Sequence, residues 1–552
     1  MRFVKAVLFL VLTQSAFPAT WYVDQTAAGF RTGRSWSDAF TDLGQITWTA
    51  FKAGDTLELA KGDFGVSWLN IGFDRALGKS NAPVTIRLAS DATRRGHVKL
   101  GGINIGNKSW VTINGSLDTN FVVPKSVHNI SQITNNIGIH LYNQAAQGVF
   151  SSGGSGQRLL WLHIYRSGAT NLPSDQAGIN FNAAVGESEV GYCWIQDSVF
   201  GDGIRVSNTK TKSWGDLSIH HNLIVNSGDD GIQCPGGVDI WCNRITGQIN
   251  GFSSGHSDGI QTWGTKIRIH HNIIGDNQSV GGGYVSWVFS QFSYQLVGDY
   301  LFYGNVLMDE YRPTSAGHAM TFDAWFVPNK YSPSTTIQNV LFANNLYHSP
   351  NHRSVGFTLH YKGTSDRGTT DKYVIRNCAF FNNVVIDMYS TSSNSDGEVL
   401  GFPGPGLTQD VTYAEFPFDA NVVTGPNWAF WYMGTRSERA EDLAIVSPYK
   451  KNTSRRPAFA GYTRGMPPYD FHLTAADTVA RDAGIDLSSW RYIAPMIDVD
   501  IDGNPRGQNG AWDIGPYEYT GDVPPPPDDC DEIRLRLQEA LETIRLMQST
   551  QR

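Results

Sequence analysis

The chain has 552 residues, of which 40% are hydrophobic and 17% charged, with 58 glycines and 16 tryptophans. This composition excludes a disordered chain and is typical of a large, ordered protein with many turns. The net charge of −8 gives no basic surface for binding nucleic acid. Five cysteines do not make a disulfide scaffold, so we expect Cys193, Cys242 and Cys378, which stand in apolar segments, to be buried thiols.

The first 19 residues are expected to be a secretory signal peptide. The stretch MRFVKAVLFLVLTQSAFPAT has two basic residues, then a short apolar run, then small residues. That run is too short to span a membrane, and no stretch of about 18 apolar residues follows. The sequence therefore predicts an exported protein, secreted or at the cell surface, with no membrane span.

A repeat with a period near 25 residues occupies the middle of the chain. Asp-Gly-Ile occurs in DGIRV at Asp202, DGIQC at Asp230 and DGIQT at Asp258, in steps of 28 residues. Short β-rich segments align between about residues 158 and 385, with no amphipathic helices between them. These features predict a parallel β-solenoid, in which equivalent residues of successive coils lie about 4.8 Å apart.

Asparagines recur at one position of this repeat, and we expect them to be structural. Stacked amides can bond one another and the backbone in a polar ladder. By alternation, one histidine of each neighbouring pair, His220–His221 and His270–His271, is expected to face inward as packing. The aligned asparagines are Asn222, Asn243, Asn272, Asn305 and Asn345.

The two ends of the mature chain resemble a known group of proteins. WYVDQTAAGFRTGRSWSDAFTDLGQI and AGDTLELAKGDF look like the N-terminal cap and first coil of secreted right-handed parallel β-helix proteins of the pectate-lyase-like group (pectin lyase fold). DFHLTAADTVARDAGIDL and DVDIDGNPRGQNGAWDIGPYEY resemble the closing coils of the same group. The resemblance implies an all-β, right-handed parallel β-helix. This fold carries lyases, hydrolases, epimerases and non-catalytic fibres, so it implies no single activity.

The domain organisation follows from these segments. After the signal peptide we expect a β-helix over residues 20–385, then an irregular region and closing coils over residues 386–520. The prolines of residues 521–529 predict a stiff linker. Residues 530–552 predict a short C-terminal coiled-coil helix that needs a partner, such as a second copy of the chain. Its a/d positions are Ile533, Leu537, Ala540, Ile544 and Met547.

In register, the three Asp-Gly-Ile segments bring Asp202, Asp230 and Asp258 into a column with neighbours about 5 Å apart. Two full charges at that distance cost about 3 kcal/mol at an effective dielectric constant of 20. A bound cation such as Ca²⁺, a raised pKa on one carboxyl group, or hydrogen bonds from the backbone can each relieve this repulsion. Ordinary Asp-Gly turn chemistry favours the third solution.

Polar neighbours also allow a functional interpretation of the column. Arg205, Gln233 and Gln261 each stand two residues after the glycine, where alternation points them outward. With the carboxylates they would line a groove that binds a glycan. The candidate catalytic residues are Asp229, Asp230, His256, Asp258, Arg205 and Lys266, the candidate substrate-binding residues are Gln233, Gln261 and Trp263, and the candidate calcium ligands are Asp202, Asp230 and Asp258.

We expect a polysaccharide-active enzyme that cleaves an acidic polymer by β-elimination. This reaction needs a cation or an arginine to neutralise the uronic-acid carboxylate, and a base to remove a proton. In this hypothesis the aspartate column holds the cation or polarises the substrate. His256, with Arg205 or Lys266, would handle protons.

Two other functions remain open. The order of GDG at Asp202, GDD at Asp229 and Asp230, and GH at His256 is similar to the polygalacturonase-type glycoside hydrolases, which implies the aspartates as carboxylates and His256 as their auxiliary. Glycoside hydrolysis uses two carboxyl groups about 5 Å apart for retention or about 6.5 to 9.5 Å apart for inversion. Alternatively, the chain is a non-enzymatic surface fibre or adhesin, or a phage tailspike-like receptor-binding protein, assembled through the C-terminal helix.

Overall fold

The computed structural model describes residues 17–521 with short gaps. Almost all of the expected signal peptide and linker, and all of the expected C-terminal helix, lie outside the described residues. Within the described part, no helix is long and apolar enough to cross a membrane. The gaps are residues 76, 143–146, 166–175, 199–200, 251–256, 280–284, 292–295, 310–318, 321, 327–333, 349–356, 362–371, 388–397, 403–416, 426–428, 433–434, 438, 443–450 and 465.

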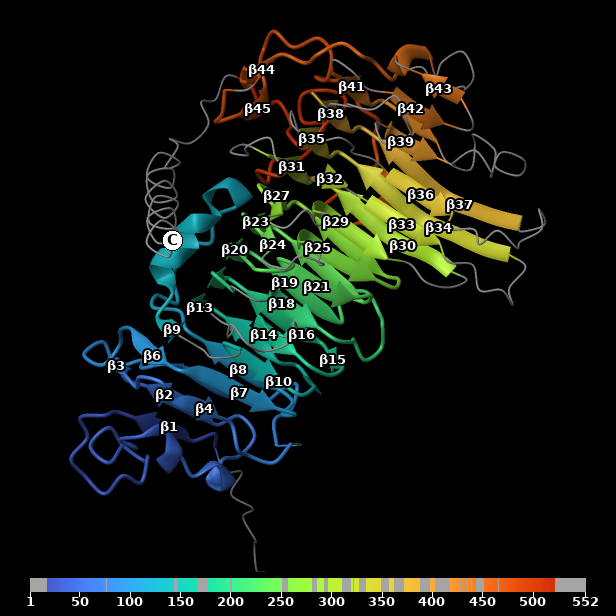
Figure 1. Cartoon of the computed structure of the whole chain (residues 1–552). Helices are drawn as coiled ribbons and strands as arrows, with labels where there is room; N and C mark the ends of the chain where they lie inside the picture. The colour runs from blue at the N-terminus through green and yellow to red at the C-terminus, as the bar shows by residue number, and fades with distance from the viewer. Residues whose placement is uncertain are drawn as a thin grey trace, which may run out of the picture.

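Three long sheets of parallel strands, here called sheets A, B and C, run side by side along the molecule (Figure 1). From β2 to β32, each coil adds one strand to A, one to B and one to C before it returns to A, and the last coils place their third strand in a separate five-stranded sheet. For example, β16, β17 and β18 are followed by β19, which pairs with β16. This arrangement confirms the expected all-β fold with long parallel sheets.

The strands of each sheet are as follows in the described residues. Sheet A contains β1 (Thr20–Val23), β2 (Thr56–Leu59), β5 (Val84–Leu88), β8 (Val111–Asn114), β12 (Arg158–Leu160), β16 (Ser188–Gly191), β19 (Leu217–His220), β22 (Val238–Trp241), β26 (Ile267–His270), β30 (Leu296–Tyr303), β34 (Ser334–Ala343), β37 (Lys372–Phe381) and β40 (Phe418–Asp419). Sheet B contains β3 (Gly62–Asp63), β6 (Val98–Leu100), β9 (Ile139–Tyr142), β13 (Leu162–Tyr165), β17 (Trp194–Gln196), β20 (Leu223–Val225), β23 (Arg244–Thr246), β27 (Ile273–Gly275), β31 (Val306–Met308), β35 (Leu346–His348), β38 (Val384–Ile386) and β41 (Val422–Thr424). Sheet C contains β4 (Trp68–Asn70), β7 (Gly102–Gly106), β10 (Val149–Ser151), β14 (Ala177–Phe181), β18 (Asp202–Val206), β21 (Ile232–Pro235), β25 (Ser257–Trp263), β29 (Val285–Gln291) and β32 (Ala319–Met320).

Smaller elements flank these sheets. A five-stranded sheet contains β33 (Phe322–Phe326), β36 (Phe357–Tyr361), β39 (Glu398–Phe402), β42 (Ala429–Tyr432) and β43 (Thr435–Ser437). Short pairs are formed by β11 (Gly154–Ser155) with β15 (Val185–Gly186), β24 (Ile249–Asn250) with β28 (Gln278–Ser279), and β44 (Phe459–Gly461) with β45 (Asp470–Leu473). The 3-10 helices are η1 (Leu43–Gln45), η2 (Trp48–Ala50), η3 (Val127–Asn136), η4 (Ala440–Asp442) and η5 (Ser488–Trp490).

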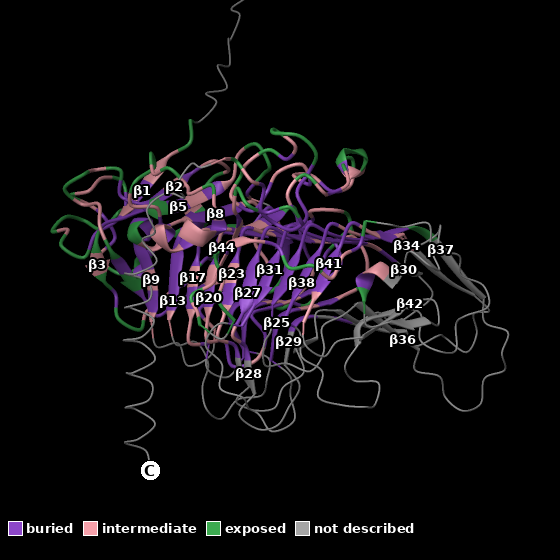
Figure 2. Ribbon diagram, turned by 90° about the horizontal axis from the view of Figure 1, so that it is seen from above, coloured by how far each residue is buried: buried purple, intermediate pink, exposed green. Residues whose placement is uncertain are grey.

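Apolar side chains from the three sheets fill the interior of the coils, and exposed residues concentrate in the turns (Figure 2). Ile204, Ile232 and Ile260 of sheet C lie in register, and none of them is accessible to solvent. The expected burial of Cys193, Cys242 and Cys378 is confirmed: these cysteines and Cys234 are buried and unbonded. A continuous core of this kind makes each coil depend on its neighbours for burial.

The expected asparagine ladder lies at the corner between sheets A and B. The backbone N–H and the Nδ2 of Asn243 both donate to Oδ1 of Asn272, at 2.9 and 3.0 Å, and Nδ2 also donates to the Ile219 carbonyl. The ladder extends beyond the five positions that the sequence singled out. Its members in the described residues are Asn222, Asn243, Asn272, Asn305, Asn345, Asn383, Asn421 and Asn452.

The prediction that one histidine of each pair faces the interior was wrong. Ile219 and Ile269 fill the core, and His220 and His270 follow them on the outer side of sheet A. His270 bonds Asp239 at 3.0 Å and stacks on Tyr303. Each second histidine takes a left-handed backbone conformation at the corner, with φ of 51° for His221 and 56° for His271. This bend ends the strand alternation on which the prediction rested.

The last described part of the chain folds back over the outer face of sheet B. Apolar residues of this closing segment, residues 456–519, pack on the outward side chains of β27 and β31. Ser126, which caps η3, donates to Oδ1 of Asp502 at 2.5 Å, and His472 lies 2.7 Å from the other oxygen of that carboxylate. These contacts tie η3 to the closing segment, which covers part of the outer face of sheet B.

Candidate functional site

The three Asp-Gly-Ile segments lie at the starts of neighbouring strands in sheet C. Ile204 pairs with Ile232, and Ile232 with Ile260, so the segments are in register as expected. Asp202, Asp230 and Asp258 therefore form a column one coil apart, and each is at most 1% exposed.

The glycine of each segment is required because there is no room for a side chain. A Cβ at Gly231 would lie 2.4 Å from Ile245 Cγ2 of sheet B and 2.5 Å from the Gly259 carbonyl oxygen. The amides of Gly203 and Ile204 both donate to the next coil, to the carbonyls of Asp230 and Gly231. Two consecutive amides that point the same way interrupt strand alternation, as in a β-bulge. The Asp-Gly-Ile segments thus form a stack of bulges. Each bulge turns its aspartate toward the outward side of sheet C, where Arg205, Gln233 and Gln261 lie.

Backbone hydrogen bonds and a raised pKa relieve the repulsion in the column. The Asp230 N–H donates to Oδ1 of Asp202 at 3.1 Å, and the Asp258 N–H donates to Oδ1 of Asp230 at 2.9 Å. Burial, with the carboxylates of Asp258, Asp202 and Asp229 nearby, raises the pKa of Asp230 well above its usual value. The middle carboxyl group therefore favours its protonated form.

Arg205, Gln233 and Gln261 form an outward row above the column, as alternation predicted. They share one register, and all three side chains are partly exposed. Gln233 Nε2 donates to Oδ2 of Asp230 at 3.2 Å and to Oε1 of Gln261 at 2.6 Å. Arg205 Nη1 lies 3.9 Å from Oδ2 of Asp202, and the arginine side chain is 24% exposed. The row thus covers the carboxylates from solvent.

The structure brings only some of the other candidate residues to this point. Asp229 is half-buried beside Asp230, and its N–H bonds the Gly201 carbonyl. Trp263 lies at the other end of β25, five residue steps or roughly 16 Å from Asp258, and Lys266 lies beyond that end. His256 lies outside the described residues.

The column as arranged here does not fit a calcium ion. Calcium takes six to eight oxygen ligands, usually from several ionised carboxylates. Oδ1 of Asp202 and Oδ1 of Asp230 each already accept a backbone N–H, which leaves fewer carboxylate oxygens for a cation. In the described ranges, no three histidine, cysteine, aspartate or glutamate side chains converge as metal ligands would. We therefore assign calcium no step in the chemistry.

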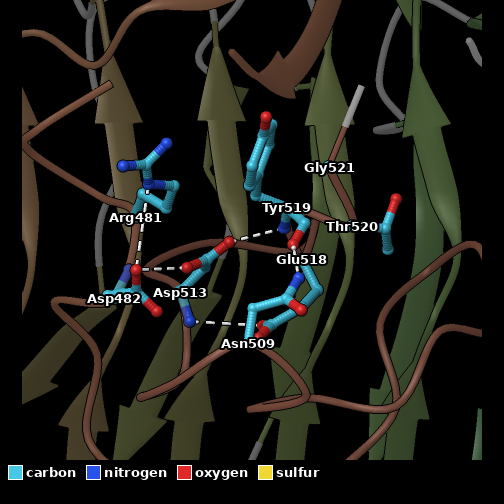
Figure 3. A pocket seen from close by; sticks show the side chains of 8 residues that line it. All are labelled: Arg481, Asp482, Asn509, Asp513, Glu518, Tyr519, Thr520 and Gly521. Atoms are coloured by element: carbon cyan, nitrogen blue, oxygen red, sulfur yellow. Dashed lines mark hydrogen bonds and ion pairs between the residues drawn. The ribbon is translucent and has the colours of Figure 1, made fainter. Parts of the chain in front are cut away.

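A polar pocket, apart from the aspartate column, lies in the closing segment, where the described chain ends (Figure 3). The Asp513 carboxylate accepts the N–H groups of Asp482 and Tyr519 at 2.7 and 2.5 Å, and burial raises its pKa to about 7. These bonds join Asp482 and Tyr519 through the Asp513 side chain, which is a structural role. The pocket has a volume of about 330 Å³ and is lined by Arg481, Asp482, Asn509, Asp513, Glu518, Tyr519, Thr520 and Gly521.

No family model and no curated protein sequence matches the chain. Among solved structures, pectate lyase Pel9A is similar at 11% identity over 91% of this chain and 96% of its own, with a TM-score of 0.34. XylC in complex with xylose is 13% identical over 90% of this chain and 98% of its own, with a TM-score of 0.41. The PL6 family polysaccharide lyase Pedsa3628 from Pseudopedobacter saltans is 11% identical over 71% of this chain and 92% of its own, with a TM-score of 0.36. Likenesses this distant carry no argument for activity, which has to come from the site itself.

Proposed function

We propose that this chain is a secreted enzyme that cleaves a polysaccharide containing uronic acids by β-elimination, at the outward row of sheet C. The observation that carries the proposal is the position of Arg205. Its guanidinium is partly exposed and lies above Asp202, and it is in register with Gln233, which covers Asp230, the carboxyl group with the raised pKa. Guanidinium binds a carboxylate through two parallel hydrogen bonds, which suits it to hold a uronic acid.

The proposed reaction needs a neutraliser, a base and an acid. Arg205 binds the substrate carboxylate and stabilises the charge that builds up on it when the proton at C5 is removed. We assign that removal to His256, two residues before Asp258 in the sequence, because Lys266 lies at the far end of the strand. The freed electron pair forms the C4–C5 double bond, and the bond from C4 to the leaving oxygen breaks. Asp230 returns a proton to that oxygen once Gln233 turns toward the sugar.

Glycoside hydrolysis is the second candidate, and the raised pKa of Asp230 favours it. Glycosidases pair a protonated carboxyl group with an ionised one. Here Asp230 would be the acid and Asp229, half-buried beside it, the base or nucleophile. Both candidates use Asp230 as an acid, and they differ in whether Arg205 has to bind a carboxylate.

The test is to incubate the purified chain with alginate, pectin and glycosaminoglycans. The ultraviolet absorbance of an unsaturated uronide supports the lyase, and new reducing ends without that absorbance support the hydrolase. Binding without cleavage would leave a surface fibre, an adhesin or a receptor-binding protein. We expect Arg205→Gln to lower kcat/KM at least about 100-fold. Arg158→Gln is the control, because Arg158 is an exposed arginine of sheet A that pairs with Glu189.

Export and self-association are part of the same proposal. By sequence alone, the first 19 residues suggest export, and residues 530–552 suggest self-association. Detecting the cleaved chain in culture medium tests export, and light scattering of the full chain against one ending at residue 521 tests self-association.

A further inference from the structure

A group of charged side chains lies where the closing segment meets the end of β38. Asp387 directly follows β38, and its side chain is only 1% exposed. Nη2 of Arg456 in the closing segment donates to Oδ1 of Asp387, and the Tyr462 hydroxyl donates to Oδ2. These two partners satisfy both oxygens of the buried carboxylate.

Arg464 is a second arginine beside the same carboxylate. Its Nε lies 3.8 Å from Oδ2 of Asp387, which is beyond hydrogen-bonding distance, and its side chain is 44% exposed. The side chain of Arg456 is 42% exposed. Each guanidinium has five N–H donors, so both arginines keep donors at the surface. Because two cations share one carboxylate, this group of three side chains has excess positive charge, which a further anion can neutralise.

Two half-buried tyrosine rings continue from the arginines. The Arg456 guanidinium lies 5.4 Å from the centroid of the Tyr462 ring, and the Tyr462 and Tyr469 ring centroids are 5.4 Å apart. His348 Nε2 lies 3.2 Å from the Tyr462 hydroxyl, so His348 and Asp387 together fix this ring. Aromatic rings can pack on the apolar faces of sugars, and guanidinium groups bind carboxylates. The cluster therefore combines the two features that suit a site for an acidic sugar.

This cluster lies at the same corner of the solenoid as Asp230. Asp387 directly follows a strand of sheet B with φ of 50°, and Asn226, at the equivalent position after β20, has φ of 58°. Asp230 follows Asn226 by four residues. Sheet B leads from β20 to β38 by way of β23, β27, β31 and β35, which makes five coil spacings of ~4.8 Å, or roughly 24 Å along the axis. A polysaccharide that extends along this corner from Asp230 would reach the arginines.

Resting on the acidic substrate of the proposed function, we infer that Arg456, Tyr462 and Arg464 form a second binding site, which anchors the polysaccharide by a uronic-acid carboxylate away from the cleavage site. Asp387 orients Arg456 and Tyr462, and Arg464 supplies the donors that the carboxylate of Asp387 does not use. Such an anchor holds the substrate and the transition state equally well. It therefore lowers KM without raising kcat.

The first experiment measures binding by affinity electrophoresis of the full chain in gels that contain polygalacturonate, alginate or hyaluronan, with uncharged hydroxyethylcellulose as the reference. Arg464→Gln should raise the Kd for the polymer that wild type binds best at least about fivefold. The matched control is Arg455→Gln, which removes the same charge from an exposed arginine that bonds Thr478 instead. Both variants are first checked by thermal melting. Equal affinity of the two variants would overturn the inference, as would a wild type that binds none of the three acidic polymers.

The second experiment separates this inference from the proposed lyase. On a polymer that wild type cleaves, Arg464→Gln should raise KM at least about fivefold and keep kcat within about twofold, because it removes binding far from the reacting bond. A lowered kcat with unchanged KM would overturn the anchor and leave the proposed lyase intact. Conversely, polymer binding that Arg464→Gln weakens, in a chain that forms no unsaturated product, would support the anchor and overturn the lyase.

Discussion

Two buried polar columns run along this solenoid. In both, side-chain oxygens accept backbone N–H groups, but one column consists of amides and the other of carboxyl groups. At the corner between sheets A and B, each asparagine accepts the N–H of the asparagine one coil earlier. At the start of sheet C, the carboxylates of Asp202 and Asp230 each accept the N–H of the aspartate one coil later. Both columns thus satisfy backbone donors that cannot reach water.

The difference between them lies in what the side chains do to one another. An amide donates as well as accepts, so Asn243 bonds Asn272 directly and the ladder is neutral throughout. An ionised carboxylate only accepts, so stacked aspartates repel one another, and burial together with this repulsion raises the pKa of Asp230. Because asparagine would satisfy the same backbone groups without charge, backbone bonding alone does not explain three aspartates. This is why we assign them to chemistry.

The largest effect is expected from breaking the asparagine ladder. Asn272→Ala leaves the Asn243 N–H and the Ile240 carbonyl buried without their partner, which should lower the free energy of unfolding by about 3 kcal/mol or more. Urea unfolding measures this. The control is Asn182→Ala, at an exposed position. A loss below about 1 kcal/mol would mean that the ladder is not a main source of stability.

Replacing an aspartate of the column by asparagine is expected to change the free energy of unfolding by a smaller amount, and in the opposite direction. Asp230→Asn keeps an oxygen for the Asp258 N–H and removes the repulsion, so it should raise the free energy of unfolding by about 1 kcal/mol. It should also lower cleavage at least about 100-fold, because the acid is lost. Asp216→Asn is the control, since this buried carboxylate accepts bonds from Thr211 and Ser213 and should lose stability. Unchanged activity would show that the column has only a structural role.

The pH dependence of the melting temperature provides a further comparison between an aspartate and an asparagine at position 230. A carboxyl group whose pKa is raised on folding stabilises the protein fully below its unfolded pKa of 3.8, and this contribution is lost as pH rises through the folded pKa. The melting temperatures of wild type and Asp230→Asn should therefore nearly coincide near pH 3.5 and separate as pH increases. Melting curves at a series of pH values measure the gap. A gap that does not change with pH would contradict a protonated Asp230.

The smallest effect is expected from calcium. Since Asp202 and Asp230 use their Oδ1 atoms for backbone bonds, adding calcium or a chelator should shift the melting temperature by less than about 1 °C. Cleavage rates in the two conditions should agree. A clear rise in melting temperature with calcium, lost in Asp258→Asn, would show that the aspartates rearrange around a cation.

Some parts of the site could be predicted from spacing, and others could not. The equal steps between the Asp-Gly-Ile segments predicted the register of Asp202, Asp230 and Asp258, because stacked coils of equal length superimpose equivalent residues. Two-residue alternation placed Gln233 on the outside. The same alternation failed at His221, where a left-handed residue bends the chain. Proximity in sequence suggested Lys266 as a partner of the column, but a full strand of sheet C separates them.

The sequence by itself determined the solenoid, its stacked polar columns and the outward row, because these follow from a repeat that every coil shares. The tertiary structure alone decided that the aspartates lie beneath Arg205 and Gln233. Their position depends on the bulge at each glycine, where an isoleucine of sheet B, such as Ile245 at Gly231, leaves no room for a side chain. The burial and the raised pKa of Asp230 were likewise decided by the tertiary structure. Both arise from carboxyl groups that are 28 residues apart in the chain and one coil apart in space.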